Sequence, residues 1–218
     1  MDRVPEPELM DDPEQASAYS EGDFADAHQR FVDCAIERFG PIAGNVLDLG
    51  CGPGDPTVRF SLANPGARIT GVDAAASMLA LAVDRVAAAG LSERIGFEQR
   101  YLPDPELEGR RYDAVISNSL LHHLNDPDSL WRTIARCARP GAAVVVMDLS
   151  RPDDTEAVEA LVARYAAGAP DVLRTDFRNS LLAAYRPDEI RQQVAGCGLA
   201  HLQVEAVSDR HLLVSGHR

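Results

Sequence analysis

The segment Val46–Asp55 carries the residues whose types and spacing most clearly suggest chemistry. It reads Val-Leu-Asp-Leu-Gly-Cys-Gly-Pro-Gly-Asp, so an apolar run leads into a turn with glycine at three alternate positions. Glycine accepts positive φ and has no Cβ, which lets a ligand approach the backbone closely. A helix is expected from Pro56 to Ala63, and its N-terminus would face a ligand held in the turn.

A carboxylate stands at the end of the next apolar run, where Asp73 closes the sequence Thr-Gly-Val-Asp. A carboxylate at this place can accept hydrogen bonds from both hydroxyls of a ribose. The glycine turn precedes Asp73 by about 20 residues, the separation typical of nucleotide-binding strand–helix–strand units. The turn and the carboxylate together indicate a ligand that contains a nucleoside.

NAD is the first alternative for such a ligand. Its binding motif has the spacing GxGxxG. The registers that begin at Gly50 and at Gly52 both lack the third glycine. An NAD-dependent oxidoreductase is therefore an alternative that the glycine spacing does not favour.

Short apolar runs alternate with helical patterns along the chain, an order typical of a parallel sheet with crossover helices. Strands are expected at residues 45–49, 68–73, 95–99, 113–117, 142–148, 201–207 and 211–215, and helices at 14–39 with a break near Gly22, 56–63, 75–89, 127–138, 155–167 and 187–197. Residues 208–210 are too short a link for a parallel crossover, so the last two strands should form a hairpin. The expected fold is α/β: a Rossmann-like, doubly wound, seven-stranded sheet, mostly parallel with an antiparallel C-terminal hairpin strand, and with helices on both faces.

The composition argues against several classes of partner. The 218 residues include 34 acidic and 21 basic ones, none of them lysine, and the formal net charge is −13. Nucleic-acid binding relies on basic residues that neutralise phosphates, so no nucleic acid partner is expected. No apolar run approaches the roughly 20 residues that span a bilayer, and no membrane partner is expected either. The N-terminus lacks a basic start followed by an apolar run, so it does not resemble a signal peptide.

The cysteines give a further indication of location and of metal content. Cys34, Cys51, Cys137 and Cys197 form no CxxC pair, and their spacing suits neither a zinc site nor a disulfide framework. Reduced thiols in a cytoplasmic protein without a bound metal are therefore expected.

Several segments jointly resemble the motifs of class I S-adenosylmethionine (SAM)-dependent methyltransferases of the small-molecule type. Val46–Asp55 resembles motif I, Gly71–Leu79 resembles motif II and Asp113–Leu124 resembles motif IV, while Arg-Pro-Gly at 139–141 before a valine-rich strand resembles the next landmark. The likeness extends from about residue 45 to 149, and the final hairpin also matches the family's sheet. The resemblance implies a transferase that moves the methyl group of SAM to a nitrogen, sulfur or oxygen of a small polar metabolite by in-line displacement, leaving S-adenosylhomocysteine (SAH).

The resemblance also implies which residues hold SAM. Asp48 and the glycine turn would hold its methionine part, Asp73 the ribose, and Ala74 and Met78 the adenine. The family often shows Gly-Asp-Ala after the third strand, whereas this chain has Arg-Tyr-Leu at 100–102, so backbone contacts and a stacked tyrosine ring are expected instead. The residues expected to bind SAM are Asp48, Gly50, Cys51, Gly52, Gly54, Asp73, Ala74, Met78, Tyr101, Leu102 and Asn118.

Two adjacent histidines are the candidate catalytic residues. His122 and His123 follow Asn118, which ends the fourth strand where ligands of open α/β sheets bind. Adjacent residues on a helix point about 100° apart, so one of the two is expected to face the cleft. A phenol or alcohol acceptor would need one of them as a base, whereas an amine, imidazole or thiolate would not. The acidic surplus suits a cationic acceptor, which favours nitrogen or sulfur over oxygen.

The whole chain, residues 1–218, is expected to form one methyltransferase domain. N-terminal helices at about 13–40 and an insertion at about 150–186 lie outside the shared core and would form an acceptor cap. Residues 176–179, Asp-Phe-Arg-Asn, read as a polar cluster between two helices, in which Arg178 or Asn179 would bind a polar group of the acceptor. The expected acceptor-binding residues are Tyr19, Phe24, His28, Asn118, His123, Arg178, Asn179 and Tyr185, and Asp23 lies in the first of the two segments.

Two other functions are compatible with the same motifs. A non-catalytic SAM-binding regulatory protein would also keep an intact glycine turn, and SAH production would exclude it. A protein acceptor is the other alternative to a small molecule. The sequence carries no indication of the oligomeric state.

Overall fold

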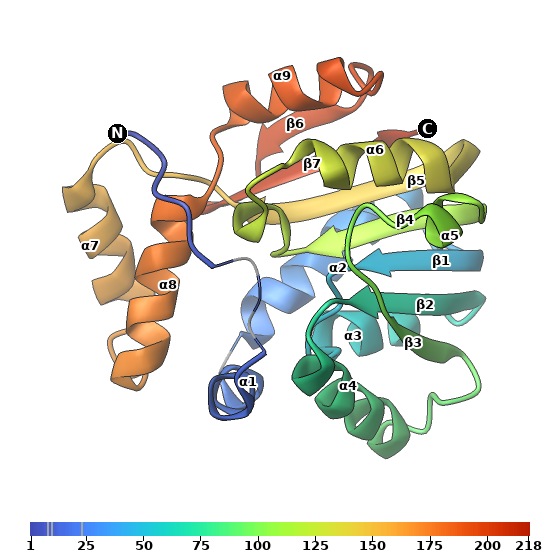
Figure 1. The fold of residues 1–218 in the computed structure, drawn as a ribbon, viewed down its shortest axis with the longest axis horizontal. Helices are drawn as coiled ribbons and strands as arrows, with labels where there is room; N and C mark the ends of the chain where they lie inside the picture. Colours follow the sequence, from blue (N-terminus) through green and yellow to red (C-terminus); the bar gives the residue numbers. More distant parts are fainter. Residues whose placement is uncertain (8, 10, 23) are drawn as a thin grey trace.

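A seven-stranded mixed sheet forms the centre of the protein (Figure 1). The computed structural model describes residues 1–218 except Glu8, Met10 and Asp23. The strands are β1 (Gly44–Leu49), β2 (Ala67–Asp73), β3 (Ile95–Gln99), β4 (Tyr112–Asn118), β5 (Ala138–Leu149), β6 (Gln203–Ala206) and β7 (His211–His217). Their order across the sheet is β3-β2-β1-β4-β5-β7-β6.

The strands β3, β2, β1, β4 and β5 pair in parallel, and β7 runs antiparallel to both of its neighbours, β5 and β6. The short link between β6 and β7 leaves a hairpin as the available connection. The predicted α/β class and the antiparallel C-terminal strand are therefore confirmed.

Helices cover both faces of the sheet, as the sequence predicts, because successive side chains of a strand point to opposite sides. On one face Leu47 and Leu49 of β1 belong to a buried cluster with Trp131. On the other face Val46 packs in a second cluster with Phe31. The helices are α1 (Pro13–Glu21), α2 (Ala25–Phe39), α3 (Asp55–Ala63), α4 (Ala76–Ala88), α5 (Pro105–Glu108), η1 (Leu121–His123), α6 (Asp128–Cys137), α7 (Thr155–Tyr165), α8 (Asp171–Ala183) and α9 (Pro187–Gly196).

Three helices extend the molecule beyond the carboxyl ends of the parallel strands, where Figure 1 shows α1, α7 and α8. Val158 of α7 and Leu181 of α8 form a small buried cluster with Leu149 at the end of β5. The N-terminal segment, residues 1–7, runs beside α8, where the N–H of Val4 donates a hydrogen bond to the carbonyl of Leu182 over 3.0 Å. These parts surround the edge of the sheet at which ligands of such folds bind.

Two expectations about the elements are corrected. Residues 176–179 are not a loop between helices but lie in the middle of α8. The apolar side of this helix is formed by Leu173, Phe177 and Leu181, which follow one another at a spacing of four. The fifth strand begins at Ala138, earlier than predicted, because Ala138 already pairs with Tyr112 of β4. Within the described residues, no helix is both long enough and apolar enough to cross a membrane.

Candidate active site

A cavity of about 210 Å³ lies at the carboxyl ends of β1, β2 and β4. Open α/β sheets bind their ligands at this edge. Most of the residues singled out from the sequence line it: Tyr19, His28, Asp48, Gly50, Cys51, Gly52, Asp73, Ala74, Met78, Tyr101, Leu102, Asn118 and His123. The fold therefore brings together residues that lie up to about a hundred positions apart in the chain.

The glycine turn shapes one wall of the cavity. Gly50 and Gly52 have φ angles of 69° and 51°, in the left-handed region that favours glycine. A Cβ on Gly50 would lie 2.8 Å from the side chain of Leu120, so the turn packs closely against the segment after β4. A Cβ on Gly52 would meet no described atom within 4 Å, because that side of the turn faces the cavity.

Asp73 is fixed by the backbone on both of its oxygens. The N–H of Gly52 donates to Oδ2 and the N–H of Ala75 donates to Oδ1, each over 2.9 Å. Burial raises the pKa of Asp73, although these two N–H groups and that of Ala74 oppose the shift. A carboxylate has about four lone-pair sites, so Asp73 keeps the capacity to accept a further hydrogen bond from a ligand.

Asp48 lies below the glycine turn with 3% of its surface exposed. The hydroxyl of Thr57 donates to its Oδ2 over 2.6 Å. Burial raises the pKa of Asp48 to about 7, against the opposing effect of the Thr57 hydrogen bond. A cationic ligand in the cavity would favour the ionised carboxylate, because an opposite charge nearby lowers a carboxyl pKa.

Asn118 ends β4 and presents a polar atom that lacks a partner. Its Oδ1 is buried and accepts no hydrogen bond within the described part of the chain. Buried polar atoms are nearly always paired, so this oxygen indicates a donor on a ligand. The next residue, Ser119, has a φ of 58°, which is unusual outside glycine. The strained turn carries the chain from β4 along the cavity to η1.

The two histidines lie on η1, and the described lining of the cavity includes His123 but not His122. This confirms that one of the two faces the cleft. His122 is buried, and its Nδ1 lies 2.5 Å from Oδ1 of Asp148, at the end of β5. Burial alone would lower the pKa of His122, but Asp148 and Glu6 outweigh it and raise the pKa.

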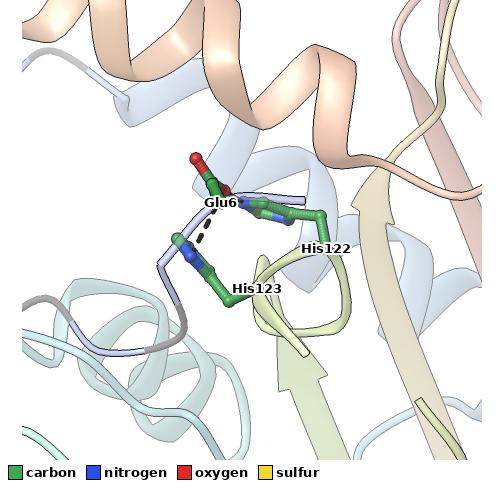
Figure 2. Close-up of side chains that lie close together, drawn as sticks. All are labelled: Glu6, His122 and His123. Atoms are coloured by element: carbon green, nitrogen blue, oxygen red, sulfur yellow. Dashed lines mark ion pairs between the residues drawn. The ribbon is translucent and has the colours of Figure 1, made fainter. Parts of the chain in front are cut away.

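Both histidine rings lie within ion-pair distance of the carboxylate of Glu6, a residue of the N-terminal segment (Figure 2). Glu6 Oε1 lies 3.2 Å from His123 Nδ1 and 3.6 Å from His122 Nε2. Burial, followed by the neighbouring His122, lowers the pKa of His123 to about 3, although Asp148 opposes the shift. His123 is therefore neutral at physiological pH.

Several predicted residues lie elsewhere. Gly54 caps α3, where its Cβ would lie 3.1 Å from that of Ala82, so it serves the packing of α3 on α4. The ring of Phe24 stacks on Tyr19 with centroids 4.9 Å apart and lines a second, adjacent cavity. Asp23 lies outside the described residues.

The predicted acceptor residues of the insertion also lie away from the cavity. Arg178 donates to Glu159 of α7 over 2.6 Å, and Asn179 is exposed on α8. The hydroxyl of Tyr185 donates to the carbonyl of Leu124 over 2.8 Å, beneath the guanidinium of Arg3. None of these three residues is among the described lining of the cavity, although Tyr185 is hydrogen-bonded to one lining residue, Leu124.

Two carboxylates at the site were not foreseen. Asp148 could have been found, because it ends a predicted strand at the same edge of the sheet as Asp73. Glu6 carries no such signal, since it precedes every predicted element and reaches His122 across 116 positions of sequence.

Comparison with known proteins gives one consistent result. A family model described as a methyltransferase domain matches residues 46–141. The chain is 35% identical over 136 residues to a ubiquinone biosynthesis O-methyltransferase of Sodalis glossinidius, an alignment that covers 60% of this chain and 53% of that protein. It is 30% identical over 188 residues to the ubiquinone/menaquinone biosynthesis C-methyltransferase UbiE of Pseudomonas savastanoi, covering 84% of this chain and 72% of UbiE. The chain thus spans about half the length of the first of these relatives and most of the second.

Solved structures share the fold at lower identity. An O-methyltransferase family protein from Burkholderia thailandensis superposes with a TM-score of 0.71 at 21% identity, covering 94% of this chain and 60% of that one. The plantazolicin methyltransferase BpumL, solved with SAH, gives a TM-score of 0.72 at 13% identity over 94% of this chain and 90% of BpumL. With the glycine turn, the Asp73 carboxylate and the seven-stranded sheet in place, the chain belongs to the class I SAM-dependent methyltransferases.

Proposed function

We propose that the cavity beside the glycine turn binds SAM and that the chain transfers the methyl group of SAM to a small polar metabolite. The observation that carries this proposal is the arrangement of Gly52, Asp73 and Asn118 around one cavity. Gly52 leaves open space where a Cβ would stand, Asp73 retains hydrogen-bonding capacity, and Asn118 presents a buried oxygen that no described residue pairs with.

These residues fit the parts of SAM. Asp73 would accept hydrogen bonds from the ribose hydroxyls, with Ala74 and Met78 beside the adenine and Tyr101 at its exposed rim. Asn118 Oδ1 would accept from the ammonium of the methionine part, and Asp48 would add a negative charge near it. When bound, SAM supplies a methyl group already activated on a sulfonium, so the protein mainly has to align the acceptor and exclude water.

The acceptor would enter between His123 and the N-terminal helices. Tyr19 of α1 and His28 of α2 line the same cavity as His123 and Asn118. We therefore assign the acceptor cap to α1, α2, α7 and α8, with the direct contacts coming from the N-terminal helices and η1. The accepting atom is a nitrogen, sulfur or oxygen of the metabolite.

A metabolite library incubated with the protein and methyl-labelled SAM tests the proposal. The expected result is label in one class of small polar molecule together with stoichiometric SAH. SAH binding without label in any small molecule or added protein would instead support a non-catalytic SAM-binding role. Label in a protein alone would overturn the small-molecule acceptor.

A further inference from the structure

Glu6, His122 and His123 direct their polar atoms toward one point beside the cavity (Figure 2). One ligand atom from each residue lies within 4.8 Å of the other two. Glu6 Oε1 is 3.6 Å from His122 Nε2 and 3.2 Å from His123 Nδ1. Ligand atoms about 2.0 Å from a tetrahedral zinc ion stand about 3.3 Å apart, so the two distances to Glu6 already match a metal site.

The hydrogen bond to Asp148 prepares His122 for this role. Asp148 accepts from the N–H groups of Leu121 and Leu149, each over 2.7 Å, which supports an ionised carboxylate. The Nδ1 of His122 then carries the proton that Asp148 accepts, so in the neutral imidazole, the form that binds a metal, the lone pair stands on Nε2, which faces Glu6. Metal-ligating histidines commonly donate their other ring N–H to a carboxylate in this way.

One buried nitrogen of the cluster is left unsatisfied by the described residues, whereas Glu6 also accepts a hydrogen bond from the Ser180 hydroxyl over 3.2 Å. His123 Nδ1 is buried and has no hydrogen-bond partner among the residues that the structure describes. The carboxylate of Asp148 is paired with the His122 ring, and the carboxylate of Glu6 lies beside both rings. A divalent cation would balance both charges and would take the lone pairs of both imidazoles.

We propose that Glu6, His122 and His123 bind a divalent transition metal ion of the Zn²⁺ type, and that an oxygen of the methyl acceptor completes its coordination. Two histidines and a carboxylate are a ligand set that Zn²⁺ and its neighbours in the first transition row prefer. The second half of the proposal rests on the proposed function, because His123 lines the cavity assigned to SAM. Three protein ligands leave a further position for a substrate, as catalytic zinc sites do.

Such a site would select an oxygen acceptor. A hydroxyl that binds the cation loses its proton to solvent at a lower pH than a free hydroxyl. Its oxygen then forms the new bond to the methyl carbon while the carbon–sulfur bond of SAM breaks and SAH leaves. The site was not expected from the sequence, because its carboxylate is Glu6 and none of the cysteines takes part.

Zinc calorimetry on the full chain, with SAH absent, tests the metal site independently of SAM. We expect one Zn²⁺ per chain, with affinity reduced at least tenfold in Glu6→Gln and in His123→Ala. Asp148→Asn should weaken zinc binding by about 10–100-fold. Asp148 is not a ligand, so the effect would arise from the loss of its hydrogen bond to His122. The matched controls Glu14→Gln and His201→Ala remove an exposed carboxylate and an exposed histidine outside the cluster, and should bind like the parent. No binding, or equal binding by Glu6→Gln, would overturn the site.

Co²⁺ in place of Zn²⁺ identifies the ligands and the open position. The Co²⁺-loaded protein should show a visible spectrum that lacks a thiolate charge-transfer band, and His123→Ala should abolish this spectrum. Both results support the three ligands named above, whereas a thiolate band would contradict them. Acetohydroxamate, a chelator that binds through oxygen, should shift the spectrum if a position is open to the acceptor; an unchanged spectrum would overturn that half of the proposal. SAH binding by Glu6→Gln, measured in parallel, shows that the variant is folded and keeps this test separate from the proposed function.

Discussion

The carboxylate of Asp73 accepts a hydrogen bond from the backbone N–H of Gly52 over 2.9 Å, across 21 positions of sequence. This bond ties the end of β2 to the glycine turn after β1, so the two parts that would hold the ribose and the methionine of SAM are fixed relative to each other. Both residues line the cavity, and both can be tested separately.

Replacing Gly52 with alanine should block the cavity without unfolding the protein. The new Cβ would stand in space that faces the cavity, at a φ of 51°. Gly40→Ala is the matched control, because Gly40 also has a left-handed φ, of 66°, and an added Cβ there would meet no described atom within 4 Å, but Gly40 lies outside the cavity lining. Each variant should lose about 1–2 kcal/mol of unfolding free energy, measured by urea denaturation. Only Gly52→Ala should lose at least tenfold in SAH affinity, and equal SAH binding by the two variants would refute this.

Asp73→Ala should weaken SAH binding by at least tenfold, because it removes the carboxylate expected to hold the ribose. Asp84→Ala, at an exposed position on α4, should leave binding unchanged. Calorimetry with SAH and with adenosine tests the assignment to the ribose. Both ligands contain the ribose, so losing a contact to it should reduce the affinity for both by the same factor. If Asp73→Ala reduced SAH binding but not adenosine binding, the assignment of Asp73 to the ribose would be incorrect.

The fold was predictable to a large extent because parallel strands buried on both faces leave continuous apolar runs. The residues 95–99 became β3 with the predicted bounds, and the break near Gly22 separates α1 from α2. The reading of residues 176–179 as a loop was wrong for a physical reason: Asp176, Arg178 and Asn179 flank Phe177, and these polar residues obscured the apolar spacing of Leu173, Phe177 and Leu181.

The residues of the site also divide into those that the sequence could predict and one that it could not. Asp48, Asp73 and the glycine turn follow strands whose carboxyl ends must meet, so their grouping could be inferred from the chain alone. Glu6 could not be, because the path of residues 1–7 depends on tertiary contacts such as Arg3 with the carbonyls of Ala183 and Leu124.

Those contacts lead to a prediction about the N-terminal segment. Arg3 also donates to the carbonyl of His122 and lies over the ring of Tyr185, with 4.2 Å between the guanidinium carbon and the ring centroid. Arg3→Ala should release the segment and speed amide hydrogen exchange at Val4, whose N–H is bonded to Leu182. Arg178→Ala, which removes another arginine near α8, should leave exchange at Val4 and the acceptor KM unchanged. Unaltered exchange at Val4 in Arg3→Ala would show that the segment is held by other contacts.

Asp48 should make stability fall as pH rises. Its pKa of about 7 in the folded protein lies above the value of about 4 in the unfolded chain. The stabilisation linked to its proton is therefore full below about pH 4 and is lost as pH rises through about 7. Asp48→Asn keeps an acceptor for the Thr57 hydroxyl without the charge. Without ligand it should exceed the parent in unfolding free energy by about 2–4 kcal/mol at pH 8, and by little at pH 4.5.

The same carboxyl should give SAM binding a pH dependence of the opposite sign. Ionised Asp48 attracts the cationic groups of SAM, so the Kd of the parent should fall between pH 6 and pH 8. The Kd of Asp48→Asn should change less over this range, as calorimetry at several pH values can show. A parent Kd that rises with pH, or an equal dependence in the variant, would exclude Asp48 as the titrating group.

Titration of the purified chain with SAH in a calorimeter tests the central claim most directly. One SAH should bind per chain with a Kd in the micromolar range or below, and Gly52→Ala should lose that binding while Gly40→Ala keeps it. The absence of heat from the folded parent protein, with neither SAH nor SAM bound at millimolar concentration, would contradict the account.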